Sequence, residues 1–256
     1  MSTSSIVARD VTQVFRRGKA KEPLLALDTV NLEIPAGSFV SLIGTSGCGK
    51  STLLRIFAGL VEPTVGDVLV DGNAVRSTDA NRGMVFQQDA VFPWLSVAEN
   101  IMYGLRARGV AKDAARAQAV EWARQVGLGG FEDAMPKELS GGMRKRVDIA
   151  RVYANEPAIL LMDEPFGALD AQTKERMQSD LLDLWEQNPR TVVFVTHDLD
   201  EAIYVSDFIV VMSARPGRIK EIHRVDLPRP RTPELRLTEE FLNTKRELHA
   251  QIGESR

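Results

Sequence analysis

The sequence predicts an α/β fold with a mainly parallel core sheet, on two observations. The first is that short apolar runs such as 158–162, 191–195 and 208–212 alternate with segments of helical pattern. Strands that are apolar throughout are typical of a parallel sheet with helices on both faces. The second is that a glycine-rich loop, 44–52, follows the apolar run 39–43 and precedes a helix of 51 to about 60.

The elements before the loop, and the two that follow its helix, are predicted to be strands. Residues 6–15 alternate weakly and contain β-branched side chains, and 24–34 has the pattern of a further strand pair after the polar turn 16–21. Residues 66–72 form a short strand that ends in an Asp-Gly turn, and 83–87 form the next. The N-terminal third is therefore rich in β-structure.

Residues 88 to about 139 have a different character, because the strand patterns stop. Residues 96–108 and 112–126 are alanine-rich and amphipathic, which predicts a helical insert. The apolar segment Phe92-Pro93-Trp94-Leu95 lies at its start, either as a local core or as a patch that faces a partner.

The helix that follows the insert is predicted to span 143 to about 155, with three cations in its first turn, Arg144, Lys145 and Arg146. Cations at this end oppose the helix dipole, so we expect an anion at the helix start.

The remaining chain alternates helices and strands and then changes character. Helices are predicted at 170–186 and 199–205, and 217–222 is predicted to pair antiparallel at an edge of the sheet. The proline-rich segment 227–233 interrupts regular structure before a polar helix at 239–252.

Composition narrows the class of protein. The 256 residues are 44% hydrophobic and carry a net charge of −3, which argues against a dedicated nucleic-acid binder. The apolar runs are too short to span a membrane, and the N-terminus has no secretory signal pattern. The single cysteine, Cys48, excludes an intramolecular disulfide and fits a reducing compartment. We expect a cytosolic protein.

The loop 44–52 carries the pattern G-x-x-x-x-G-K-[ST], which predicts phosphate binding. A glycine-rich turn that merely caps a helix is the alternative. Lys50 supplies a charge for the outer phosphates of a nucleoside triphosphate, and the hydroxyl of Ser51 or Thr52 can bind its Mg²⁺. The candidate nucleotide-binding residues are Gly44, Thr45, Ser46, Gly47, Cys48, Gly49, Lys50, Ser51 and Thr52.

Polar residues at the ends of other strands complete a hydrolytic site. A histidine or glutamine alone at such a place is more often structural, but a phosphate loop in the same sheet favours a functional role. Asp163 is the candidate Mg²⁺ carboxylate, and Glu164 is placed to polarise an attacking water. Gln87 can bridge the metal, the water and the insert, and His197 can contact the terminal phosphate. Phe15 could stack on a base, although composition alone favours a core phenylalanine.

Six motifs in this order resemble those of the ATP-binding cassette (ABC) ATPases, from residue 7 to about 212. They are the Walker A loop 44–52, the Q-loop Gln87, the signature 139–143, Walker B at 159–163 with Glu164 after it, the D-loop 168–170 and the switch histidine His197. The resemblance implies a P-loop NTPase cassette with a mainly parallel core sheet, an antiparallel β edge and an α-helical subdomain. It implies an ATP-binding core of 1–87 and 140–225, an inserted helical subdomain of 88–139, and a C-terminal proline-rich linker and helix of 226–256.

The resemblance also implies residue roles and partners. Two copies would close head to tail, with Ser140, Gly141 and Gly142 of one on the ATP held by the other, and with the D-loop Asp170 at the same site. Phe15 matches the aromatic that stacks on adenine, where a tyrosine is common, and Met143 replaces a common glutamine while the Ser-Gly-Gly core is intact. Cys48 fills a variable loop position, where we expect a thiol that maleimide modifies and ATP protects.

The single cassette and its flanking motifs, 85–88 with 92–95 and 212–218 with 227–231, resemble the nitrate, sulfonate and taurine importer branch. This implies an ATPase peripheral to the cytoplasmic face of the inner membrane, bound to permease subunits and served indirectly by a solute-binding protein. Docking is expected near Gln87 and Phe92-Pro93-Trp94. The alternatives are a lipid-transport ATPase or a non-transport cassette ATPase acting on DNA or ribosomes, although no nucleic-acid partner is expected.

Overall fold

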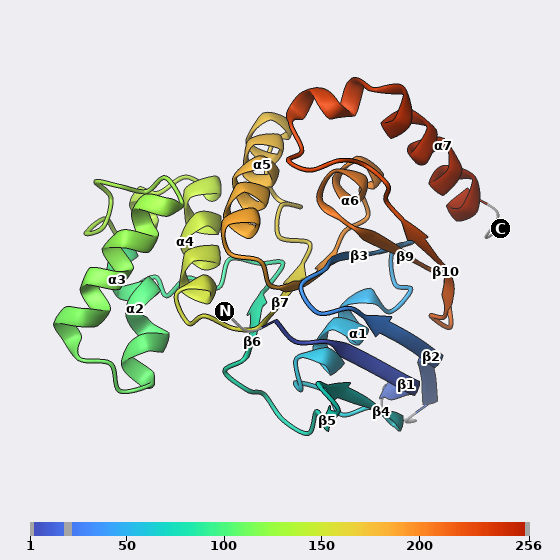
Figure 1. Ribbon diagram of the computed structural model, residues 1–256. Coiled ribbons are helices and arrows are strands. Elements are labelled where there is room, and N and C mark those ends of the chain that lie inside the picture. The colour runs from blue at the N-terminus through green and yellow to red at the C-terminus, as the bar shows by residue number, and fades with distance from the viewer. Residues whose placement is uncertain (1–2, 18–21, 254–256) are drawn as a thin grey trace.

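The computed structural model describes residues 3–17 and 22–253, and it is built around two β-sheets (Figure 1). The larger sheet has six strands in the order β10-β9-β3-β8-β7-β6, and all are parallel except β10, which runs antiparallel to β9 at one edge. The predicted parallel core with an antiparallel edge is confirmed. The strands are β3 (Phe39–Gly44), β6 (Arg82–Val85), β7 (Ile159–Asp163), β8 (Thr191–Val195), β9 (Phe208–Met212) and β10 (Ile219–Arg224).

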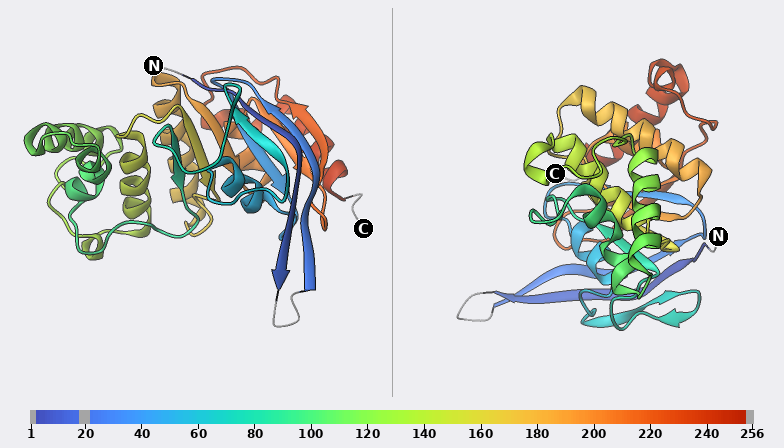
Figure 2. Two further views of the ribbon diagram at one scale, coloured as in Figure 1. Left: turned by 90° about the horizontal axis from the view of Figure 1, so that it is seen from below. Right: turned by 90° about the vertical axis from the view of Figure 1, so that its left-hand side faces the viewer.

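The smaller sheet is antiparallel, with the order β2-β1-β4-β5. Its strands are β1 (Ile6–Arg17), β2 (Glu22–Ile34), β4 (Val65–Val70) and β5 (Asn73–Ala74). The expected strand pair at 24–34 is wrong, because β2 is one continuous strand that pairs with β1 along its length. The ends of β1 and β2 project from the body of the molecule as a long hairpin (Figure 2).

Alternation along the core strands explains the layers of the fold. Val40 and Leu42 of β3 face a core that includes helix α1 (Lys50–Phe57) and the antiparallel sheet, so α1 lies between the two sheets. Phe39 and Ile43 face the opposite core, which helices α5 (Ala171–Gln187) and α6 (Leu199–Val205) cover. Both faces of the parallel sheet are therefore buried.

The predicted helical insert is present at one side of the molecule, as helices α2 (Val97–Ala107) and α3 (Lys112–Gln125) and the short helix η1 (Pro136–Glu138) (Figure 1). Helix α4 (Gly141–Tyr153) supplies Val147 and Ala150 to the core of the insert and Ile149 and Tyr153 to that of the parallel sheet. Helix α4 therefore connects the core of the insert to the core of the parallel sheet.

The last segment packs along α6 rather than standing apart. It contains the short helix η2 (Pro233–Leu237) and helix α7 (Glu239–Gly253), which buries Phe241 and Leu248. Each buried side chain of this size contributes about 1.5–3 kcal/mol to folding. Within the described part of the chain, no helix combines the length and the apolar character needed to cross a membrane.

Candidate functional site

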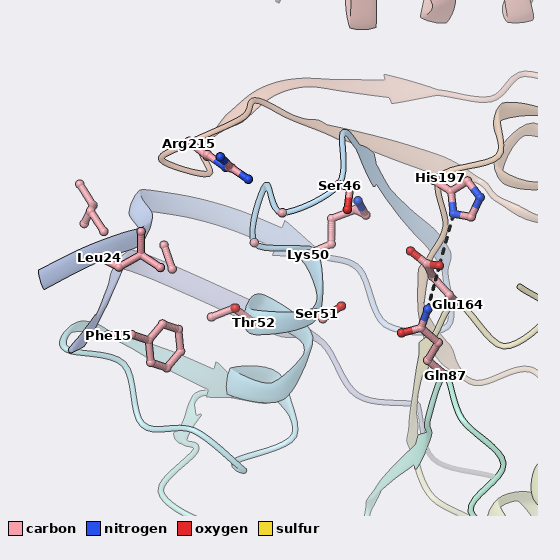
Figure 3. Close-up of a pocket in the computed structure, with 14 residues that line it drawn as sticks. Phe15, Leu24, Ser46, Lys50, Ser51, Thr52, Gln87, Glu164, His197 and Arg215 are labelled. Atoms are coloured by element: carbon pink, nitrogen blue, oxygen red, sulfur yellow. Dashed lines mark hydrogen bonds and ion pairs between the residues drawn. The ribbon is translucent and has the colours of Figure 1, made fainter. Parts of the chain in front are cut away.

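A cleft of about 720 Å³ opens at the carboxyl edge of the parallel strands, which is the edge where ligands bind in open α/β sheets. The phosphate loop forms its middle, the β1–β2 hairpin forms one end, and residues after β6, β7 and β8 form the other (Figure 3). It is lined by Phe15, Leu24, Leu25, Ala26, Ser46, Gly47, Gly49, Lys50, Ser51, Thr52, Gln87, Glu164, His197 and Arg215.

The loop presents an uncapped helix end to the cleft. Gly49 is the N-cap of α1, has a φ of +97°, and lies so close to β2 that an added Cβ would be 3.1 Å from the carbonyl oxygen of Ala26. It offers no side chain to cap the helix, and the first turn of α1 contains no acidic residue. The helix start therefore provides positive potential and backbone N–H groups for an anion.

Lys50 lies within the loop, with a side chain that is almost fully buried. Its Nζ donates to the carbonyl oxygens of Gly44 at 2.8 Å and Thr45 at 3.2 Å. These bonds fix the ammonium on the cleft side of the loop, where it can neutralise phosphate charge.

The neighbouring oxygen atoms suit Mg²⁺. The Ser51 hydroxyl donates to Asp163 Oδ1 at 2.7 Å, and burial raises the pKa of Asp163 against the opposing effect of that hydrogen bond. The residues that the structure describes hold no group of three His, Cys, Asp or Glu side chains able to bind a metal alone. One carboxylate and one hydroxyl are what Mg²⁺ uses when substrate phosphates and water supply its other ligands.

Three side chains from three strand ends meet at the far end of the cleft (Figure 3). Gln87 Nε2 donates to Glu164 Oε2 at 3.3 Å, and His197 Nδ1 lies 3.3 Å from the same oxygen. Glu164 has a φ of +42°, a left-handed conformation that a glutamate rarely adopts, and its N–H donates to the carbonyl oxygen of Val195 at 3.0 Å. Strain of this kind persists where the surrounding structure imposes it, often at functional sites.

The segment that carries His197 is held by α5 and α6. Asp198 caps α6 through the N–H groups of Asp200 and Glu201, and Lys174 of α5 binds its carboxylate at 2.7 Å. Burial alone would raise the pKa of Asp198, but these hydrogen bonds and the Lys174 charge hold it below its usual range. Asp198 therefore remains a charged anchor next to His197 at neutral pH.

The predicted signature and D-loop residues do not line this cleft. Ser140 caps α4 by accepting from the N–H of Met143 at 3.3 Å, and Asp170 caps α5 by accepting from the N–H of Thr173 at 3.0 Å. A Cβ on Gly142 would lie 2.9 Å from Thr173 Cγ2, which shows that the two helix starts pack together. The structure therefore brings the signature and D-loop residues together, at the starts of α4 and α5 and outside the cleft.

The expected anion beside Arg144, Lys145 and Arg146 does not follow from their positions. Helix α4 begins two residues earlier than predicted, so Lys145 and Arg146 lie beyond its first turn. The three cations pair with carboxylates of the chain itself: Arg144 and Lys145 with Asp89, Lys145 also with Asp148, and Arg146 with Asp180. Their charges are neutralised within the chain without an external anion.

Cys48 also differs from expectation. Its side chain is fully buried behind the loop, with its sulfur 2.9 Å from where a Gly44 Cβ would stand. Along with Gly44 and Thr45, it does not line the cleft. The expected attack of maleimide on an open thiol is therefore wrong for this conformation.

Four cleft residues were missed from the sequence. Leu24 pairs directly with Phe15 across β1 and β2, and Leu25 and Ala26 follow it. Treating 6–15 and 24–34 as one hairpin would have found them. Arg215 follows β9, which pairs with β3, so its place beside the phosphate loop depends on a strand order that sequence alone did not provide.

Comparisons with known proteins agree with this geometry. The family model described as ABC transporter matches residues 27–167. The chain is 45% identical to the aliphatic sulfonates import ATP-binding protein SsuB of Bacillus cereus, over 89% of each chain. It is 46% identical to the taurine import ATP-binding protein TauB of Burkholderia pseudomallei, over 88% of this chain and 86% of that one.

A solved structure with a TM-score of 0.76 covers 87% of this chain and 100% of its own, at 34% identity. It is described as the dimeric structure of a post-hydrolysis state of an ATP-binding cassette bound to ADP and Pi.

Proposed function

Since the chain belongs to the ABC transporter family, we propose that it is the ATP-hydrolysing subunit of an importer that takes up a small sulfonate, such as taurine or an aliphatic sulfonate. The observation that carries the proposal is the cleft in which the phosphate loop faces Glu164 and His197. ATP binds with its phosphates on the loop and its base toward Phe15 and Leu24, whose apolar side chains form the other end of the cleft.

Hydrolysis requires a positioned water and neutralised phosphate charge. Glu164 is the general base, because its carboxylate faces the cleft and contacts both Gln87 and His197. His197, after β8, positions that carboxylate and contacts the terminal phosphate. Gln87, after β6 on the other side of β7, holds the Glu164 side chain in place. Lys50 and the N–H groups at the start of α1 balance the charge of the outer phosphates.

Mg²⁺ fits this site through Ser51 and Asp163, with Gln87 as a further candidate from an adjacent strand end. The ion supplies charge neutralisation between the outer phosphates when bound. Before it binds, the Ser51 hydroxyl keeps the buried Asp163 carboxylate paired, so the oxygen donors are held together in advance.

The second part of the site comes from another copy of the chain. Ser140 is exposed and Gly141 and Gly142 are half-buried at a helix start outside the cleft. Apart from its chain neighbours and the backbone of its own helix, the nearest heavy atom to an added Cβ on Gly141 is 3.8 Å away. This open helix start suits the terminal phosphate held by a partner copy, with Asp170 beside it. ATP binding therefore closes a dimer, and hydrolysis reopens it.

The permease surface lies between the insert and the core. A groove of about 530 Å³ there is lined by apolar side chains including Phe86, Phe92 and Tyr103, with Trp94 exposed at 70% beside it. Phe92 packs on Trp94 and Tyr103 with ring centroids 5.6 and 4.6 Å apart. Gln87 directly follows Phe86 in the chain and donates a hydrogen bond to Glu164. A permease segment bound in this groove would therefore affect the position of Gln87 and, through it, of Glu164.

This assignment places the chain on the cytoplasmic face of the inner membrane, with an extracytoplasmic solute-binding protein acting through the permease. Affinity purification of the tagged chain from detergent-solubilised membranes tests it. We expect permease subunits to co-purify, and the complex to hydrolyse ATP faster when solute-binding protein and its sulfonate are added. Purification of the chain without any integral membrane partner would contradict the proposal. A Trp94→Ala variant is expected to lose the partner while keeping its nucleotide affinity.

A further inference from the structure

The turn between β9 and β10 is fixed beside the phosphate loop at both of its ends. β9 pairs with β3 as far as Met212 and Gly44, so the chain leaves β9 next to the start of the loop. Gly217 is held on β2, because its N–H donates to the carbonyl oxygen of Ala26 at 3.0 Å and its own carbonyl accepts from Asp28. The residues between these anchors therefore lie over the cleft.

Arg215 is the cation of this turn that extends over the loop (Figure 3). Its Nη2 and Nε atoms lie 3.5 and 3.8 Å from where a Cβ of Gly47 would stand. Its side chain makes no ion pair or hydrogen bond to any residue of the ranges 3–17 and 22–253. Arg218, three residues later, instead binds the Asp28 carboxylate through Nε at 2.9 Å.

The backbone at Arg215 is also unusual, because its φ is +33° and the residue is not glycine. Such a conformation costs about 1–3 kcal/mol and requires support from its surroundings. The two anchors at Met212 and Gly217 provide that support. The turn thus holds an exposed guanidinium at the cleft although, among the described residues, that side chain has no hydrogen-bond or ion-pair partner.

We propose that Arg215 binds the phosphates of the nucleotide, opposite Lys50 across the loop. The inference rests on the proposed function and adds to it a residue outside the ATPase motifs. The phosphates are the part of the nucleotide that this guanidinium would contact, because it lies next to Gly47 of the phosphate loop. The base would lie at the other part of the cleft, which Phe15 and Leu24 form. A planar guanidinium donates two parallel hydrogen bonds to phosphate oxygens, which the single ammonium of Lys50 cannot do.

Because Arg215 has no hydrogen-bond or ion-pair partner in residues 3–17 and 22–253, its substitution is a clean test. Arg215→Gln removes the charge and keeps a polar side chain of similar shape, so the variant should fold and melt like the wild-type chain. Arg9→Gln is the matched control, since Arg9 is exposed on β1 about 20 Å along the strand from Phe15. Arg215→Lys keeps the positive charge but loses the planar guanidinium and its two parallel hydrogen bonds.

The experiment measures ADP affinity by calorimetry and adenosine affinity by competition, both at low salt. ADP is used so that closure of an ATP-bound dimer does not enter the result. We expect Arg215→Gln to weaken ADP binding about tenfold, with adenosine unchanged and a smaller difference at 0.5 M salt. The ADP affinity of Arg215→Lys should lie between those of the wild type and Arg215→Gln, and the ADP affinity of Arg9→Gln should match that of the wild type.

Wild-type ADP affinity in Arg215→Gln would overturn the inference, as would an equal loss of adenosine affinity, which would place Arg215 on the base or ribose. Failure of the wild-type chain itself to bind ADP would instead overturn the proposed function.

Discussion

The phosphate loop and the start of α4 are both helix starts rich in glycine, yet their surroundings differ. The loop opens into a cleft with Lys50, Ser51, Asp163 and Glu164 around it. The start of α4 lies outside that cleft, is capped by the Ser140 side chain, and has no acidic residue in its own first turn. Under the proposed function, this difference means that one chain carries what is needed to hold ATP but only part of what is needed to hydrolyse it. Each prediction below changes one of the two regions and asks whether binding or hydrolysis responds.

The largest effect is expected at the cleft, from Glu164→Gln. Removing the base while keeping the shape of the side chain should lower ATP hydrolysis about 1000-fold. ATP affinity should stay within threefold, since Lys50 and the loop are untouched. A steady-state ATPase assay beside equilibrium binding measures both, and hydrolysis near the wild-type rate would remove Glu164 from its role.

Gly141→Asp tests the α4 start alone. A Cβ fits there, and an acid in the first turn of a helix is favourable by about 0.3–1 kcal/mol, so the variant should fold with an unchanged or higher Tm. The new charge would repel the phosphate of a partner's ATP, and we expect hydrolysis to fall about 100-fold with ADP affinity unchanged. Gly141→Asn controls for size without charge and should lose far less activity. Full activity in Gly141→Asp would mean that this helix start takes no part in hydrolysis.

His197→Ala should have a smaller effect, because it removes one contact of Glu164 and leaves Gln87 in place. The loss of this one contact with Glu164 predicts about a tenfold fall in the hydrolysis rate at unchanged ATP affinity. His197→Gln, which can still donate toward Glu164, should recover part of it. A change in ATP affinity without a change in rate would assign His197 to binding instead.

The smallest effect is expected from thiol labelling at Cys48. The buried side chain predicts slow reaction with maleimide in the folded protein, at a rate that ADP changes less than twofold. Denatured chain gives the reference rate, and mass spectrometry follows the labelling. Rapid labelling of the folded chain, with strong protection by ADP, would show that the phosphate loop opens in solution. That result would weaken the contrast between the phosphate loop and the start of α4.

Much of this arrangement was predictable, because apolar runs and glycine-rich loops act locally. Periodicity located β8, β9 and α6 at their observed bounds, and the loop pattern and the strand ends predicted Lys50, Ser51 and Glu164, which line the cleft. These predictions depend on side chains near their own strand ends, and parallel strands bring such ends to one edge.

The remaining features depend on contacts between distant segments. The partners of Lys145 and Arg146 come from the segment after β6 and from α5, so sequence alone assigned their charge to an external anion. Arg215 reaches the cleft only because β9 lies beside β3, and Cys48 is buried in the core between the two sheets, with its carbonyl covered by Gly217 of the turn after β9. Strand order and turn packing of this kind leave no periodic pattern in the sequence.

The central claim is that the loop of one copy and the α4 start of another form one hydrolytic site. It is tested most directly by mixing Lys50→Ala with the slow variant Gly141→Asp and measuring the rate of single-turnover ATP hydrolysis. The mixed dimer contains one intact pairing of loop and helix start, so the mixture should hydrolyse one ATP per mixed dimer at close to the wild-type rate, which neither variant alone reaches. If native mass spectrometry detects the mixed dimer and hydrolysis stays at the level of the separate variants, the site does not join two copies.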